Sequence, residues 1–135
     1  MVDPAYIFRF PQHAFTLFCN DLLRAEAGRL GMSQVHVDTT VRETVPDGGV
    51  DACVRHVTYV PGWSGSRWFP EGNSFWQFKS GKCPSAPDLS RQEFTKPEVI
   101  AAIDRDDTYC FLTADSLTSR KKTNLAIHCQ TLFNF

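Results

Sequence analysis

The chain lacks any apolar run near the roughly 20 residues that a membrane-spanning helix needs. It begins Met1-Val2-Asp3-Pro4, without a basic region followed by an apolar one, so we expect no secretory signal and no membrane partner. An excess of one charge is also missing, because 14 Lys and Arg oppose 15 Asp and Glu. Any basic surface for nucleic acid must therefore be local.

Metal-ligand clusters of cysteine and histidine are absent as well. The five cysteines contain no CxxC pair, and neither they nor the four histidines have the spacing of zinc ligands. An odd number of cysteines, mostly in apolar contexts, predicts buried free thiols in a reducing compartment. We therefore expect a cytoplasmic protein without structural zinc.

What the chain does have is ample material for one core. It has 135 residues, of which 42% are hydrophobic and 13% aromatic. This length and composition suit a single domain over residues 1–135. The apolar residues 131–135 leave open whether the native chain continues or whether its last helix docks on another domain.

Hydrophobic periodicity and turn residues divide the chain into alternating elements. Helices are predicted over 11–28, over 97–103 and from Ser116 onward, and strands over 35–41, 50–60, 73–79 and 108–113. The last of these strands is a continuous apolar run, typical of a central strand buried on both faces. A helical crossover before it implies that it runs parallel to its neighbour. We expect an α/β fold, a four-stranded mixed sheet flanked by helices in the order α-β-β-β-α-β-α.

A lysine ends the otherwise apolar strand 73–79. Side chains alternate across a strand, so Lys79 shares a face with Phe75 and Gln77 and needs a charged partner there. In strand 50–60 the same alternation puts one set of side chains together: Asp51, Cys53, Arg55, Val57 and Tyr59. If the two strands pair as an antiparallel hairpin, Asp51 lies beside Gln77 and Lys79.

This convergence suits metal-dependent phosphodiester hydrolysis. A divalent ion neutralises phosphate charge, orients a water and lowers its pKa. Mg²⁺ takes oxygen ligands, commonly one or two carboxylates with substrate oxygens and waters. The candidate ligands of Mg²⁺, or of Mn²⁺, are the carboxylate of Asp51, the side-chain carbonyl of Gln77 and the backbone carbonyl of Phe78. Lys79 would contact the scissile phosphate or the attacking water, so the candidate catalytic residues are Asp51, Gln77 and Lys79.

The stretch Gly48-Gly49-Val50-Asp51-Ala52, followed by Gln77-Phe78-Lys79, resembles the PD-(D/E)XK nuclease superfamily. It is most similar to the Mrr-like restriction endonuclease branch, where a GxD strand start precedes QxK. The element order and the segment 15–23, similar to the family's first helix, extend the resemblance over almost the whole chain. The resemblance implies a restriction-endonuclease-like core and Mg²⁺-dependent cleavage of double-stranded DNA. Domains of this type often serve as N-terminal effectors of multi-domain antiphage defence proteins.

Two positions depart from the family's pattern. Thr16 stands where members often carry a helix glutamate, and the middle position of the QxK motif is neutral Gln77. Asp47 or Glu43 could compensate with a carboxylate. The alternative is therefore a nuclease-like module, weak or inactive in catalysis, that binds nucleic acid or a partner protein. An Asp–Lys pair without the other features would be a plain salt bridge.

Basic side chains offer candidate DNA contacts. Arg55 shares a strand face with Asp51, and Arg120, Lys121 and Lys122 form a short run that could neutralise phosphates. For this run, a solvated helix face and a set of phosphate contacts are about equally good interpretations. The aromatic loop containing Trp63 and Trp68 is better explained by packing or by a partner interface than by a DNA wedge. Cutting both strands requires two sites, so we expect a homo-oligomer or further domains of a larger defence protein.

Overall fold

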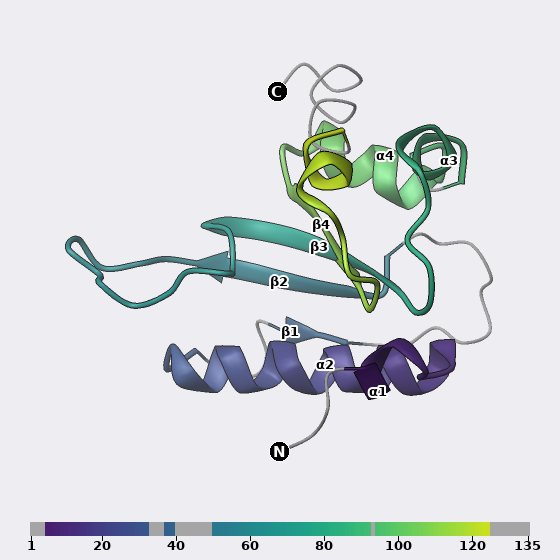
Figure 1. Ribbon diagram of the computed structural model, residues 1–135. Helices are drawn as coiled ribbons and strands as arrows, with labels where there is room; N and C mark the ends of the chain where they lie inside the picture. The colour runs from purple at the N-terminus through teal and green to yellow at the C-terminus, as the bar shows by residue number, and fades with distance from the viewer. Residues whose placement is uncertain (1–4, 33–36, 40–49, 93, 125–135) are drawn as a thin grey trace.

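The computed structural model describes residues 5–32, 37–39, 50–92 and 94–124 as an α/β fold (Figure 1). Its elements are α1 (Ala5–Phe8), α2 (Gln12–Arg29), β1 (Val37–Asp38), β2 (Ala52–Val57), β3 (Gly72–Lys79), α3 (Ala86–Gln92), α4 (Pro97–Asp104) and β4 (Thr108–Thr113). Residues 119–124 are also helical. The flanks of β1 and the end of the predicted last helix fall outside the described residues.

The four strands form one mixed sheet in the order β1-β2-β3-β4. The pairs β1–β2 and β2–β3 are antiparallel, and β3 and β4 are parallel. The expected mixed sheet, the hairpin and the parallel last strand are confirmed. The central place predicted for β4 is wrong, because among the described strands it pairs with β3 alone. Its side chains contact the cores on both faces, so the apolar run reflected two covered faces and not two neighbouring strands.

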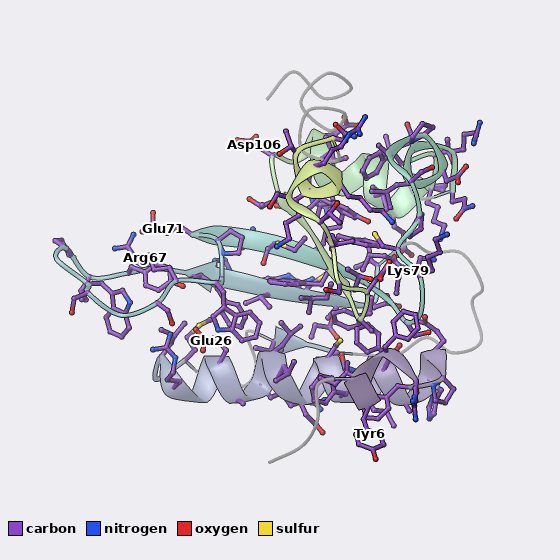
Figure 2. The ribbon with its side chains drawn as sticks, viewed as in Figure 1. Tyr6, Glu26, Arg67, Glu71, Lys79 and Asp106 are labelled. Carbon is purple, nitrogen blue, oxygen red and sulfur yellow. The ribbon has the colours of Figure 1, made fainter. Side chains whose placement is uncertain are left out.

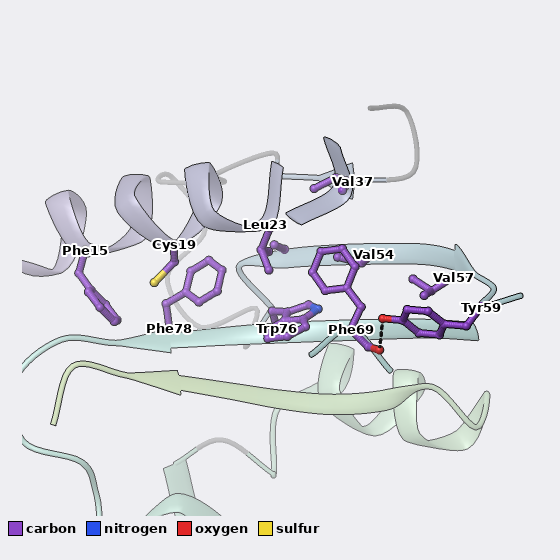
Figure 3. Close-up of a cluster of buried hydrophobic side chains, with 12 residues drawn as sticks. Phe15, Cys19, Leu23, Val37, Val54, Val57, Tyr59, Phe69, Trp76 and Phe78 are labelled. Atoms are coloured by element: carbon purple, nitrogen blue, oxygen red, sulfur yellow. Dashed lines mark hydrogen bonds between the residues drawn. The ribbon is translucent and has the colours of Figure 1, made fainter. Parts of the chain in front are cut away.

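The helices cover the two faces of the sheet, with α2 on one and α3 and α4 on the other (Figure 1). Residues four apart on α2 bury against the Trp76 and Phe78 side of β3 (Figure 3). Those α2 residues are Phe15, Cys19, Leu23 and Ala27. The opposite face buries Phe75 with side chains of α3 and α4. The two cores hold β3 between them, which fixes the strand that carries the candidate site.

A β-bulge changes the faces that strict alternation predicted for β2. Val54 pairs with Ser74 and Val57 with Gly72, so two residues of β2 between these pairs lie opposite one residue of β3. His56 takes up the difference with a φ of 59°, and its N–H bonds the Asn73 side chain. Val57 and Tyr59 therefore join Val54 in the core beneath α2, not the face of Asp51. The predictions for Val57 and Tyr59 were wrong because a bulge inverts the alternation beyond it.

The loop between β2 and β3 folds back on the core beneath α2. Phe69 is buried, and its carbonyl accepts a hydrogen bond from the Tyr59 hydroxyl (Figure 3). Trp68 packs edge-on against Trp76, with ring centroids 6.3 Å apart. The aromatic residues of this loop thus have a packing role, as the sequence favoured.

Several other features bear on the predictions. Helices α1 and α3 were not predicted, since α1 is a single turn and α3 begins within a proline-rich segment. The four described cysteines, Cys19, Cys53, Cys83 and Cys110, are free thiols. Within the described ranges, no helix has both the length and the apolar character to span a membrane.

We expect protonation of Glu26 to weaken the fold at low pH. Its buried carboxylate accepts two hydrogen bonds from Arg29, of 2.8 and 2.6 Å. The bond to Arg29 is the main reason that the pKa of Glu26 lies below its usual value. The stabilisation is therefore complete above the unfolded pKa of about 4.3 and is lost as pH falls through the folded pKa.

The change that tests this is Glu26→Gln, which should cost roughly 1–2 kcal/mol near neutral pH. Urea unfolding from about pH 7 to about pH 3 should show a smaller loss of stability in Glu26→Gln than in the wild type. Glu71→Gln is the matched control, because the Glu71 pair with Arg67 is 3.9 Å long and exposed. Parallel pH profiles for wild type and Glu26→Gln would contradict the expectation.

Candidate functional site

The end of β3 projects beyond its antiparallel neighbour. Ala52, the first residue of β2, lies opposite Trp76, so no residue of β2 lies opposite Phe78. The N–H of Phe78 donates instead to Oδ2 of Asp51, at 2.7 Å, and the N–H of Asp51 donates to the carbonyl of Trp76, at 2.8 Å. Asp51 thus contacts the residues on either side of Gln77. The predicted approach of Asp51 to the QxK strand is present.

Gln77 carries a buried oxygen that has no partner among the described residues. Its side chain is 6% exposed, and Oε1 accepts no hydrogen bond there. An unmet buried acceptor costs about 1–3 kcal/mol. Such a group is usually explained by a water, an ion or a functional role. The sequence pointed to Gln77, but only the structure shows that its side-chain oxygen is buried without a hydrogen-bond partner among the described residues.

Lys79 is half-buried at the carboxyl end of β3, on the side of the sheet that faces α3 and α4 (Figure 2). It lies opposite Thr113 of β4, and its carbonyl accepts from the N–H of Ala114, at 3.2 Å. The carboxyl ends of two parallel strands and the start of β2 therefore meet at one edge of the sheet. That edge carries Asp51, Gln77 and Lys79.

Gln12, at the start of α2, is a site residue that the sequence reasoning missed. Its Nε2 donates to the Phe78 carbonyl, at 2.9 Å, and its Oε1 accepts from the Ser80 N–H, at 3.1 Å. Nε2 also donates to the hydroxyl of Thr16, at 3.2 Å. The Phe78 carbonyl proposed as a metal ligand thus already accepts one bond. Gln12 is 66 positions from Phe78 and 68 from Ser80 in the sequence, and no local motif predicts contacts over such separations.

The predicted DNA-contacting residues lie in two places. Arg55 is exposed and pairs with Asp38 at 3.9 Å. Arg120 and Lys122 are exposed on the helical segment 119–124. Lys121 instead donates to the Cys83 carbonyl, at 2.8 Å, and lies 3.8 Å from the carboxylate of Asp115, which follows β4. Lys121 therefore ties the segment after β3 to the segment after β4.

A pocket of about 310 Å³ opens beside Asp51 on the α4 side of the sheet. Its wall combines apolar side chains with three carboxylates and two guanidinium groups. The lining residues are Asp38, Val50, Asp51, Ala52, Cys53, Arg55, Phe75, Glu98, Ala101, Ala102 and Arg105. Arg55 and Asp51 thus share one pocket, as their common strand face predicted.

The thiols near this edge are not poised as nucleophiles. Burial, together with the negative charge of Asp51, raises the pKa of Cys19 to about 12. Burial also raises the pKa of Cys53, in the wall of the pocket. Because a thiolate is the reactive form of cysteine, these side chains stay inert near neutral pH.

No group of three His, Cys, Asp or Glu side chains placed to hold a metal ion occurs in the described part of the chain. Asp47 and Glu43, named above as compensating acids, lie outside those residues. Asp51 is a described carboxylate that contacts the end of β3, through the N–H of Phe78. Comparisons with protein-family models, with curated proteins and with solved structures gave no match to this chain.

Proposed function

We propose that this chain is a divalent-metal-dependent endonuclease domain acting on double-stranded DNA. The observation that carries the proposal is the contact of Asp51 with both neighbours of Gln77, which gathers Asp51, Gln77 and Lys79 at one edge of the sheet. A carboxylate, an unsatisfied amide oxygen and an ammonium group together suit the hydrolysis of a phosphodiester.

The residues at this edge fit a hard cation. Mg²⁺ prefers oxygen ligands and is usually bound by one or two carboxylates plus substrate phosphate oxygens and waters. Asp51 offers the carboxylate, and Oε1 of Gln77 is a buried oxygen without a described partner. When bound, Mg²⁺ or Mn²⁺ would lower the pKa of a water and neutralise phosphate charge. With one carboxylate, we expect weak binding of the metal in the absence of DNA.

Each residue of the proposed site has a distinct role. Asp51 and Gln77 hold the cation, and the carbonyl of Phe78 offers it a third oxygen beside the bond from Gln12. The ammonium of Lys79 stabilises negative charge on the phosphate as the bond to the leaving oxygen breaks. Arg55, Arg120 and Lys122 neutralise neighbouring phosphates, and binding should weaken with salt accordingly.

The resemblance to PD-(D/E)XK nucleases of the Mrr-like branch supports the same assignment. The mixed sheet with helices on both faces is compatible with a restriction-endonuclease-like core. We extend the proposal to the role that such domains often have, as the effector of a bacterial antiphage defence protein. A second copy, or further domains of that protein, would supply the second site needed for a double-strand break.

The direct test is incubation of the protein with supercoiled plasmid and Mg²⁺, with EDTA as the control. We expect nicked and then linear DNA in Mg²⁺ or Mn²⁺ and intact plasmid in EDTA. An intact plasmid across both metals and all protein concentrations, with the full-length protein, would refute the endonuclease function.

We expect Gln77→Glu to make the fold depend on metal. The substitution puts a second carboxylate in place of the buried amide, and a buried unpaired charge is costly. Without metal the variant should unfold at a lower temperature than the wild type. Mg²⁺ should raise its melting temperature more than that of the wild type, because the ion pairs with both carboxylates.

The measurement is thermal unfolding in EDTA and in a series of Mg²⁺ concentrations. Gln92→Glu, an exposed position on α3, adds the same charge away from the edge and should show no such dependence. Equal melting temperatures of Gln77→Glu in EDTA and in Mg²⁺ would argue against a cation at Gln77.

A second candidate is a nuclease-like module that binds nucleic acid or a protein without cutting. The observation that favours it is the bond of the Phe78 carbonyl to the neutral amide of Gln12, which also bonds Thr16, the position where PD-(D/E)XK nucleases often carry a glutamate. Such a module has no need of a metal. Retention of labelled duplex DNA in EDTA, with no response to Mg²⁺ in calorimetry, would favour this candidate over the enzyme.

A further inference from the structure

We propose that Gln12 is a positioning residue that fixes the backbone of Lys79 and so aims its ammonium group at the phosphate. The proposal rests on the function proposed above and adds a residue to that site. It comes from the bonds between the Gln12 amide and the end of β3, far away in the sequence.

The Gln12 amide forms hydrogen bonds with both peptide groups that flank Lys79. The carbonyl of Phe78 belongs to the peptide group before Lys79, and the N–H of Ser80 belongs to the one after it. Gln12 donates to the first, at 2.9 Å, and accepts from the second, at 3.1 Å. The orientations of these two groups define φ and ψ of Lys79. One side chain therefore restrains both backbone torsions of the proposed catalytic lysine.

The amide is itself held in a single orientation. A glutamine side chain has two donor hydrogens and an acceptor oxygen with two lone pairs. Nε2 donates to the Phe78 carbonyl and to the Thr16 hydroxyl, and Oε1 accepts from the N–H and the hydroxyl of Ser80. All four capacities are used, so a flipped amide would place donors against donors. This network also explains a polar pair, Gln12 and Thr16, at the start of α2.

Loss of the Gln12 side chain should affect the catalytic rate much more than the stability of the fold. Gln12 is exposed, and each neutral bond that it makes contributes about 1 kcal/mol or less to stability. Its loss should leave the fold intact. A catalytic group displaced by about 1 Å can nevertheless lower a rate by about 100-fold. The backbone of Lys79 sets the direction of its Cα–Cβ bond, and this direction sets the region that the flexible side chain and its ammonium can reach.

The test compares Gln12→Ala and Gln12→Met with the wild type and with Gln92→Ala. Methionine keeps the length of glutamine but makes none of its strong hydrogen bonds, so it separates bonding from volume. We expect both Gln12 variants to lower kcat by about 100-fold with KM unchanged, and Gln92→Ala to match the wild type. Amide hydrogen exchange at Ser80, measured without metal, should be faster in both Gln12 variants.

Gln12→Glu supplies a partial rescue. Its carboxylate still accepts from Ser80 but cannot donate to the Phe78 carbonyl, so its kcat should lie between those of the wild type and Gln12→Ala. Unchanged exchange at Ser80 in the Ala and Met variants would show that Gln12 does not hold the Ser80 N–H in a hydrogen bond. Faster exchange with unchanged kcat would also overturn the positioning role. Absence of cleavage by the wild type refutes the nuclease function itself, which is a different failure.

Discussion

Lys79→Ala is expected to lower the rate of DNA cleavage by on the order of 100- to 1,000-fold, which is the range found when one preorganised charge-stabilising donor is removed. The ammonium group is proposed to act on charge that develops at the phosphate, so the loss should appear in kcat. Metal binding should be unchanged, because Lys79 is not a proposed ligand. The measurement is single-turnover cleavage of a plasmid at saturating Mg²⁺.

Two further variants sharpen the test of Lys79. Lys82→Ala removes an exposed lysine from the adjoining loop and should keep the wild-type rate. Lys79→Arg keeps the charge but presents a planar fork from a longer side chain, so it should restore only part of the rate. Equal rates for wild type and Lys79→Ala would remove Lys79 from the chemistry and leave it a structural role at the end of β3.

Asp51→Asn should lower metal affinity by at least the roughly 10- to 100-fold that loss of an outer-shell partner costs. The carboxylate of Asp51 contacts the end of β3, whereas asparagine would offer only a neutral oxygen there. That oxygen can still accept the bond from the N–H of Phe78, so the fold should lose little stability. Asp51→Ala removes the acceptor as well and should cost about 1–3 kcal/mol.

Calorimetric titration with Mn²⁺ measures the affinity, and urea unfolding measures the stability of each variant. Asp38→Asn is the matched control, since Asp38 lines the same pocket but pairs with Arg55. A loss of stability in Asp51→Ala with equal Mn²⁺ affinity in all variants would mean that Asp51 only closes the end of the hairpin. That outcome favours the binding module over the enzyme.

The sequence predicted the parts of the fold that depend on local patterns. Hydrophobic periodicity predicted α2 close to its observed bounds, the alternation in β3 gave its two faces correctly, and the turn-rich stretch between β2 and β3 gave the antiparallel hairpin. From that hairpin alone followed the approach of Asp51 to Gln77. These predictions succeeded because helix periodicity, strand alternation and antiparallel pairing each impose a geometry on neighbouring residues.

The features that were missed depend on tertiary contacts. His56 takes a positive φ within a bulge, and no residue type in β2 announces that change of register. The apolar run of β4 indicates that both faces of the strand are buried. It does not indicate how many strands pair with β4. Gln12 reaches Ser80 across 68 positions of sequence, so only the packing of α2 on the sheet could reveal it. The unsatisfied oxygen of Gln77 likewise emerges only from its surroundings.

The claim that a metal ion is held at this edge can be tested by paramagnetic broadening of backbone amide signals with Mn²⁺. We expect the signals of Gln77, Phe78 and Lys79 to broaden first in the wild type and to persist in Asp51→Asn. Persistence of these three signals in the wild type, while signals near other carboxylates such as Asp115 broaden, would contradict that claim.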